Sequence, residues 1–100
     1  MNRFEDIRNW AHERNIIEGA TTQAQFVKLI EEVGELASGI AKSRLGVIVD
    51  GIGDAVVVLT ILASQNGVTI EQCIEHAWNE IKDRKGRMVN GVFVKEADLK

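Results

Sequence analysis

The sequence of 100 residues has no proline, no tyrosine, one cysteine and only 5% aromatic residues. Sheet-rich domains with many tight turns usually need proline and aromatic side chains, so these absences argue against an all-β sandwich and favour helices. The single cysteine, Cys73, cannot form a disulfide within the chain, which fits a reducing, cytoplasmic location. A basic excess is also lacking, because the net charge is −3, and no nucleic-acid partner is expected.

No signal peptide is expected at the N-terminus, because MNRFEDIRNW alternates in charge and has no apolar core. The most apolar stretch, residues 45–63, is nearly long enough to span a bilayer. Asp50 and Asp54 interrupt it, and each would cost roughly 2.5–3.5 kcal/mol near the centre of a helix in lipid. We therefore predict a buried helix in a soluble protein without a membrane partner.

Hydrophobic spacing predicts a set of amphipathic helices separated by breakers. They are expected over about residues 3–15, 22–44, 47–66 and 69–85. Between the first two, around residues 18–20, the pattern lapses. Thr21–Thr22 and Thr69 are suitable N-cap residues, and Gly67 is a C-terminal stop. Lys42 and Arg44 are expected in the last turn of the second helix, where the helix dipole favours cations.

Residues 47–66 have two interpretations. Many of them are β-branched, which favours a strand with a turn at Asp50–Gly51. The run is too long for a usual strand, however, and its apolar residues from Ile48 to Leu62 keep helical spacing. We prefer the helix.

The predicted fold is all-α. It is an antiparallel four-helix bundle in a single domain, residues 1–100, with a short C-terminal hairpin whose two-residue turn is Asn90–Gly91. A chain this small, with this much apolar surface, suits helices that bury a second face against another copy. We therefore expect a homodimer or a homotetramer.

Two acidic stretches are the candidates for chemistry. Glu32 and Glu35 lie about 60° apart on one helix face, and Asp50 and Asp54 lie about 40° apart on the next helix. Because a short connection makes the two helices antiparallel neighbours, the four carboxylates should meet near one level. Such an oxygen-only cluster suits Mg²⁺, or alternatively Mn²⁺. For the glutamates, a solvated helix face remains the alternative, whereas the aspartates interrupt an apolar helix and need an explanation.

Glycines inside the predicted helices accompany these acids, although each costs about 1 kcal/mol relative to alanine. Their absent side chains would let helix backbones approach, or leave room for a metal ion and a substrate. They are Gly34, Gly39, Gly51 and Gly53.

At these residues the sequence resembles the MazG-like family of all-α nucleoside triphosphate pyrophosphohydrolases, in its small, phage-type form. The family signature is Glu-x-x-Glu on one helix and Glu-x-x-Asp on the next. Glu32 and Glu35 fall on the metal-ligand positions of the first half, and Asp54 matches the final Asp of the second half. Gly51 stands where the family has the other Glu, so Asp50 is expected to take over that ligand role.

The resemblance implies hydrolysis of a (deoxy)nucleoside triphosphate to the monophosphate and pyrophosphate with Mg²⁺, by a dimer or a tetramer. Glu31 is then a candidate for orienting or deprotonating the attacking water. The candidate substrate-binding residues are Lys28, Asn79, Lys82, Arg84 and Lys85. For the basic residues near the end of the last helix, favourable placement at a helix C-terminus is the alternative. The rival function is a non-catalytic helical module that oligomerises and binds a nucleotide or a partner.

The remaining aromatic and histidine residues suggest no further site. Trp10 and Trp78 are expected in the core, with base stacking as the alternative. His12 and His76 are expected at the surface, and the sequence lacks the ligand spacing of a zinc site.

Overall fold

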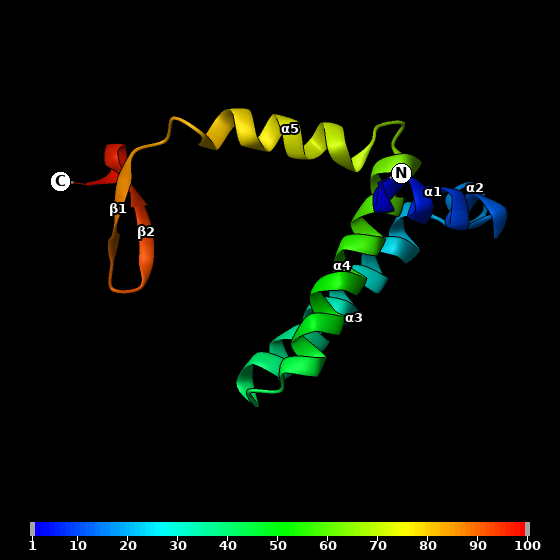
Figure 1. Cartoon of the computed structure of the whole chain (residues 1–100), viewed down its shortest axis with the longest axis horizontal. Helices are drawn as coiled ribbons and strands as arrows, with labels where there is room; N and C mark the ends of the chain where they lie inside the picture. The colour runs from blue at the N-terminus through cyan, green and yellow to red at the C-terminus, as the bar shows by residue number, and fades with distance from the viewer. Residues whose placement is uncertain (1, 100) are drawn as a thin grey trace. The chain divides into compact units, whose positions relative to one another are not determined.

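The computed structural model describes residues 2–99, and within them it is mostly helical, as predicted (Figure 1). The elements are α1 (Arg3–Glu13), α2 (Ile16–Gly19), α3 (Thr22–Ala41), α4 (Leu45–Gln65), α5 (Ile70–Ile81), β1 (Gly86–Val89), β2 (Val92–Lys95) and the 3₁₀ helix η1 (Glu96–Asp98). The chain divides into two compact units, residues 1–70 and 71–100. The single domain stays a prediction.

The first unit is built on an antiparallel pair formed by α3 and α4, which run side by side (Figure 1). The residues that face each other recur at steps of three and four, which is the spacing of two helices packed along their length. We call this row the inner seam. On α3 it comprises Gln25, Leu29, Glu32, Leu36 and Gly39, and on α4 Ile48, Gly51, Ala55, Val58 and Leu62, all buried or half-buried.

Two glycines set how closely the helices of the inner seam approach. A Cβ atom built on Gly39 would lie 2.9 Å from Val47 Cγ1, and one built on Gly51 would lie 2.9 Å from Leu36 Cβ. Any side chain at these positions would push the helices apart. The expectation of close backbone approach is therefore confirmed for both. Gly34 and Gly53 differ, because no described atom outside their own helix lies within 4 Å of the Cβ position.

The ends of α3 and α4 follow most of the predicted signals. Thr21 caps α3, its Oγ1 accepting a hydrogen bond from Ala24 N at 3.0 Å. Residue Gly67, with φ +76°, follows α4 as predicted. However, α3 ends at Ala41 and Ser43 takes a left-handed φ of 53° to reverse the chain. The prediction that Lys42 and Arg44 lie in the last turn of α3 was therefore wrong.

The segment with two interpretations is helical over the whole of α4, so the preferred interpretation is confirmed. By length and composition, α4 is also the one helix among residues 2–99 that could cross a membrane. One side of it is occupied by α3 along the inner seam, and Asp50 and Asp54 interrupt its apolar sequence.

Helices α1 and α2 pack against α4 through a small core. Ala11 and Ile17 meet Ile61 there, with Ile16 and Val57 at its margin. The sequence did not predict α2, because a four-residue helix is too short to show a period. Gln65 fixes the end of α4 to this region, its Nε2 donating to the carbonyl oxygen of Ala20 at 2.9 Å.

The second unit contains α5, the hairpin and η1. The predicted turn is confirmed, because Val89 pairs with Val92 and both Asn90 and Gly91 have positive φ, 51° and 82°, as a type I′ turn requires. Helix α5 ends at Ile81 rather than near Gly86, which instead begins β1. None of the described side chains from residue 71 onward is buried, so this unit has no core of its own.

A second apolar row, which we call the outer stripe, runs along α3 and α4 and is exposed. Leu45, for example, has 73% of its surface exposed. The row follows the same helical spacing as the inner seam, in steps of three, four and seven residues. It comprises Phe26, Ile30, Val33 and Ile40 on α3, and Leu45, Val49, Ile52 and Leu59 on α4. The predicted four-helix bundle stays a prediction, because the first unit shows one long antiparallel pair with the shorter α1 and α2 beside it.

The tryptophans are not in the core. Trp10 is 44% exposed and Trp78 is 54% exposed, so neither lies in a core of its own unit and the core interpretation is wrong at that level. His12 and His76 are exposed, as expected.

Candidate metal centre

Glu32 is a carboxylate placed in the inner seam. It lies between Leu29 and Leu36 in the steps of three and four, and only 6% of its surface is exposed. The contacts of Gly39 and Gly51 fix an antiparallel register that puts Glu32 opposite Ala55, beside Asp54. A buried carboxylate in an apolar row is unfavourable unless it is paired, so this residue needs a partner.

The partners that Glu32 has are weak. Its Oε1 lies 3.7 Å from Lys28 Nζ, one helical turn earlier. Its Oε2 is buried and no hydrogen bond within the usual distance and angle reaches it, although Asp54 lies close enough for a side-chain hydrogen bond that helps to raise the pKa of Glu32. The carboxylate is thus only partly neutralised by the chain itself.

Neighbouring acids make the position more unfavourable for a negative charge. Burial raises the pKa of Glu32, and the charges of Glu35 and Asp54 raise it further, while Lys28 lowers it. Glu35 comes from the next turn of α3, and Asp54 comes from α4. Three carboxylates on two helices therefore lie close enough to repel one another, which is an arrangement that a bound cation would relieve.

The other predicted ligand, Asp50, is exposed and is not among the groups that act on Glu32. It shares a flank of α4 with Asp54, one turn away. Within residues 2–99, no three Asp, Glu, His or Cys side chains converge closely enough to hold a metal ion directly. The carboxylates are therefore gathered near one level without forming a preassembled ligand set.

Gly51, where the signature departs, is buried against α3. Because a Cβ atom would lie 2.9 Å from Leu36 Cβ, this position faces the partner helix at its closest approach. A glutamate at this position would not fit the observed packing.

The remaining candidates are distributed over both units. Glu31 is exposed on α3 beside Glu32, and Lys28 lies at the carboxylates. The second unit carries the others on exposed positions, namely Asn79 on α5, Lys82 directly after it, and Arg84 and Lys85 before β1.

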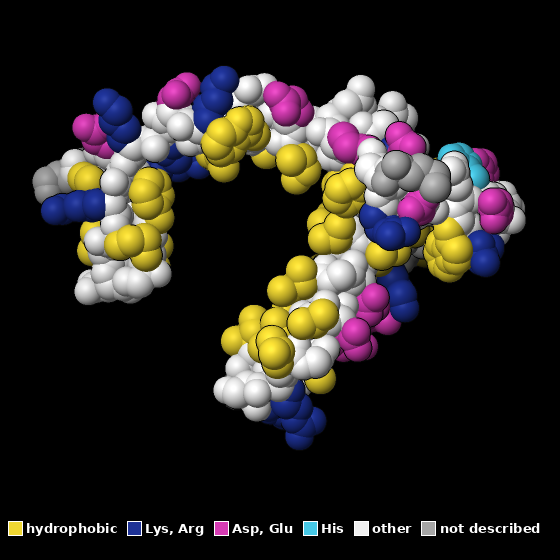
Figure 2. Space-filling view, in the orientation of Figure 1, with side chains coloured by type: hydrophobic (Ala, Val, Ile, Leu, Met, Phe, Trp, Pro, Cys, Tyr) yellow, Lys and Arg dark blue, Asp and Glu magenta, His cyan; other side chains and the backbone are white. Residues whose placement is uncertain are grey.

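The charged and apolar surfaces of the α3–α4 pair lie on different sides of it. Figure 2 shows acidic side chains gathered on one flank of the α3–α4 pair and hydrophobic side chains along the opposite flank. We call the acidic side, which carries Glu35, Asp50 and Asp54, the acidic flank. The acidic flank and the outer stripe thus occupy different sides of the same two helices.

A family model for the MazG nucleotide pyrophosphohydrolase domain matches residues 20–89, which include α3, α4, α5 and β1. The chain belongs to this family. The match covers the acidic flank and spans both compact units.

Comparison with curated proteins gives a relative from a virus. An uncharacterized 18.2 kDa protein in the rep-hol intergenic region of Haemophilus phage HP1 (strain HP1c1) is 53% identical over 65 residues. The match covers 65% of this MazG-family chain and 40% of the phage protein, so the chain spans less than half of that relative. No solved structure matches the chain.

Proposed function

We propose that this protein hydrolyses (deoxy)nucleoside triphosphates to the monophosphate and pyrophosphate with Mg²⁺, or alternatively Mn²⁺. Membership of the MazG family supports the substrate class. The single observation that carries the site is the buried Glu32, whose Oε2 has no hydrogen bond of usual distance and angle while two further carboxylates lie beside it.

The residues of the acidic flank fit a hard divalent cation. Glu32, Glu35 and Asp54 offer only oxygen ligands, which Mg²⁺ and Mn²⁺ prefer. The buried Oε2 of Glu32 is the kind of atom that a cation satisfies. We include Asp50 as the fourth carboxylate, because it shares the flank with Asp54.

The proposed roles of the chain's own residues follow from their places. A bound divalent cation supplies charge neutralisation on the phosphates and lowers the pKa of water. Glu31, beside Glu32 and exposed, orients or deprotonates the water that attacks the α-phosphorus. Lys28, which lies beside the Glu32 carboxylate, contacts a phosphate oxygen of the substrate. In the second unit, substrate contacts are assigned to Asn79, Lys82, Arg84 and Lys85.

We also propose that the protein works as a homodimer or homotetramer in the cytoplasm, without a membrane or nucleic-acid partner. The outer stripe and the coreless second unit both leave apolar side chains to be covered by another chain. Covering the outer stripe with the same stripe of a second copy would complete a four-helix bundle.

The rival function is a non-catalytic module that oligomerises and binds a nucleotide or a partner. Gly51 in place of the signature glutamate favours it, because one ligand position is lost. Incubating the protein with Mg²⁺ and each triphosphate, and measuring released pyrophosphate, tests the two functions. Release that disappears in Glu35→Gln purified in the same way supports the enzyme, and nucleotide binding without release supports the rival.

A further inference from the structure

An open groove lies between α1 and α4 on the side of α4 that carries the acidic flank. Its volume is about 340 Å³, and its lining is almost wholly apolar, formed by Asp6, Ile7, Trp10 and Val57. This volume is at the lower end of the range for small-molecule sites in proteins. The predicted chemistry uses none of these four residues.

The groove begins one helical turn from the candidate metal centre. Val57 follows Asp54 by three residues, so the two side chains share a flank of α4 about 4.5 Å apart along the helix axis. An extended ligand on this flank could therefore reach both the carboxylates and the groove. From this continuity we infer that the groove receives the nucleobase of the triphosphate and holds it by its faces, without reading its edge. The inference rests on the proposed function.

The wall formed by Trp10 is held in place by Arg14. The Arg14 guanidinium lies 4.7 Å from the centre of the indole ring, and its Nη1 donates to the carbonyl oxygen of Trp10 at 3.1 Å. An aromatic ring beside aliphatic side chains suits a flat, π-bonded ligand such as a base, because every base has a π-face.

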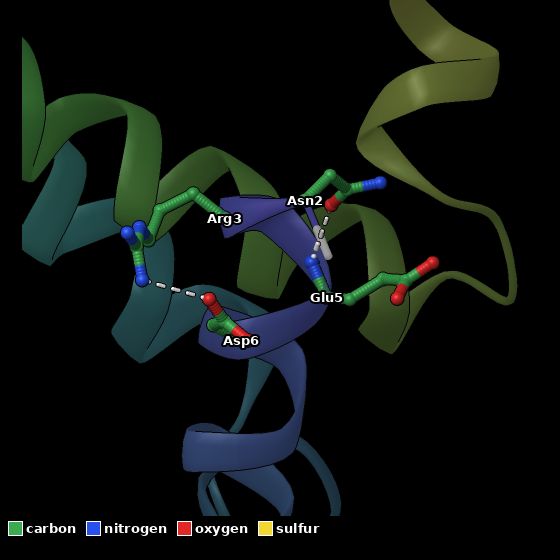
Figure 3. A network of polar contacts seen from close by, with 4 residues as sticks. All are labelled: Asn2, Arg3, Glu5 and Asp6. Carbon is green, nitrogen blue, oxygen red and sulfur yellow. Dashed lines mark hydrogen bonds and ion pairs between the residues drawn. The ribbon is translucent and has the colours of Figure 1, made fainter.

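The one charged side chain of the lining is engaged elsewhere. Asp6 Oδ2 accepts a hydrogen bond from Arg3 Nη1 at 2.9 Å, in the first turn of α1, where Asn2 Oδ1 also caps Glu5 N at 2.8 Å (Figure 3). With that carboxylate turned to Arg3, the groove offers the base contact surface rather than a pattern of donors and acceptors. An apolar pocket of this kind discriminates weakly between ligands of similar shape.

The test compares a nucleotide with a base-free ligand. With Mg²⁺ present, α,β-methylene-ATP should bind the wild-type protein about tenfold or more tightly than inorganic tripolyphosphate. In Trp10→Ala this difference should collapse, while Trp10→Phe keeps most of it. If Trp10→Ala does not fold, Trp10→Leu keeps the apolar contact and removes the ring. An unchanged preference for the nucleotide in the folded variant overturns the inference.

Two further readouts separate the possible failures. The kcat/KM values for dATP, dCTP, dGTP and dTTP should agree within about tenfold, and a preference above about a thousandfold for one base would demonstrate edge reading and overturn the inference. A Trp10 variant that dissociates an oligomer in sedimentation would assign the groove to a second copy instead. Absence of binding and cleavage with every triphosphate would contradict the proposed function itself, whereas cleavage that is indifferent to Trp10 contradicts only the groove.

Discussion

The inner seam and the outer stripe of the α3–α4 pair are built on the same spacing, yet within the first unit only the inner seam is buried. They differ in content as well. The inner seam contains Gly39 and Gly51 at its closest contacts and one buried carboxylate, Glu32, whereas the outer stripe is apolar throughout. Apolar spacing alone therefore predicts that a helix face will be packed against another surface. Glycine or a carboxylate within that face indicates whether it serves close helix packing or a candidate site.

The largest expected effect comes from removing a carboxylate beside the inner seam. Glu35→Gln should lower pyrophosphate release about a hundredfold or more, since even indirect partners of a metal ligand are worth 10–100-fold. The same variant should lose the increase in melting temperature that Mg²⁺ gives the wild-type protein.

Glu75→Gln, an exposed change on α5, is the matched control and should leave both readouts intact. An unchanged Mg²⁺ shift in Glu35→Gln would remove Glu35 from the site.

The two aspartates of α4 sharpen the comparison. Asp54 acts on the buried Glu32, whereas Asp50 is exposed one turn away. We expect Asp54→Asn to reduce turnover about a hundredfold or more, and Asp50→Asn to reduce it by a smaller factor, because direct ligands matter more than outer ones. Equal losses of turnover with unchanged melting temperatures would indicate that both aspartates bind the metal ion. Full activity of Asp50→Asn would remove Asp50 from the proposed ligands and leave the other three carboxylates.

The outer stripe can be tested by charge. Ile30→Lys or Val49→Lys should shift the protein from oligomer to monomer in sedimentation velocity, because an unpaired lysine cannot be buried in an apolar interface. Ser38→Lys, exposed on α3 outside the outer stripe, is the control and should remain assembled. A wild-type protein that sediments only at 11.1 kDa at high concentration would contradict the proposed assembly.

Replacing either of two glycines of α4 by alanine should change the melting temperature in opposite directions. Gly51→Ala should lower the melting temperature, since overpacking against Leu36 costs about 1–3 kcal/mol. Gly53→Ala, whose Cβ enters open space, should raise it, since alanine gains up to about 1 kcal/mol in a helix. Differential scanning calorimetry on both variants checks the pair, and the same sign for both would contradict the tight contact at Gly51.

The smallest expected effect concerns the pH dependence of stability. Because the pKa of Glu32 is raised by folding, its favourable contribution is fully present below the ordinary value of 4.5 and is lost as the pH rises through the raised value. Without metal at neutral pH, Glu32→Gln should therefore melt above wild type, and this gain should shrink on acidification. The exposed Glu31→Gln is the control and should show neither change.

Sequence reasoning succeeded where the determinant is local. The cap at Thr21 and the turn at Asn90–Gly91 depend on a few neighbouring residues, and both were found as predicted. The helical state of α4 followed from its period, against the strand preference of its β-branched residues. These features need no knowledge of what lies across the fold.

Features that depend on a partner in space could not be read in the same way. The fit of Gly51 against Leu36 and the exposure of Trp10 depend on which faces meet. For the candidate site, the sequence predicted that the acids on α3 and α4 approach each other. It did not reveal that Glu32 alone is buried, although its spacing from Leu29 and Leu36 carried that signal.

The left-handed turn at Ser43 has a consequence for folding kinetics. It reverses the chain within three residues, with Arg44 N donating to Gly39 O at 2.9 Å, so the inner-seam contacts beside the turn, such as that of Gly39 with Val47, join residues that are near in sequence. Low contact order favours fast folding, and the α3–α4 pair should form early. Contacts of the outer stripe with another chain would instead depend on encounter and hence on protein concentration. During synthesis, a newly formed α3–α4 pair would thus expose the apolar outer stripe until a second copy binds it.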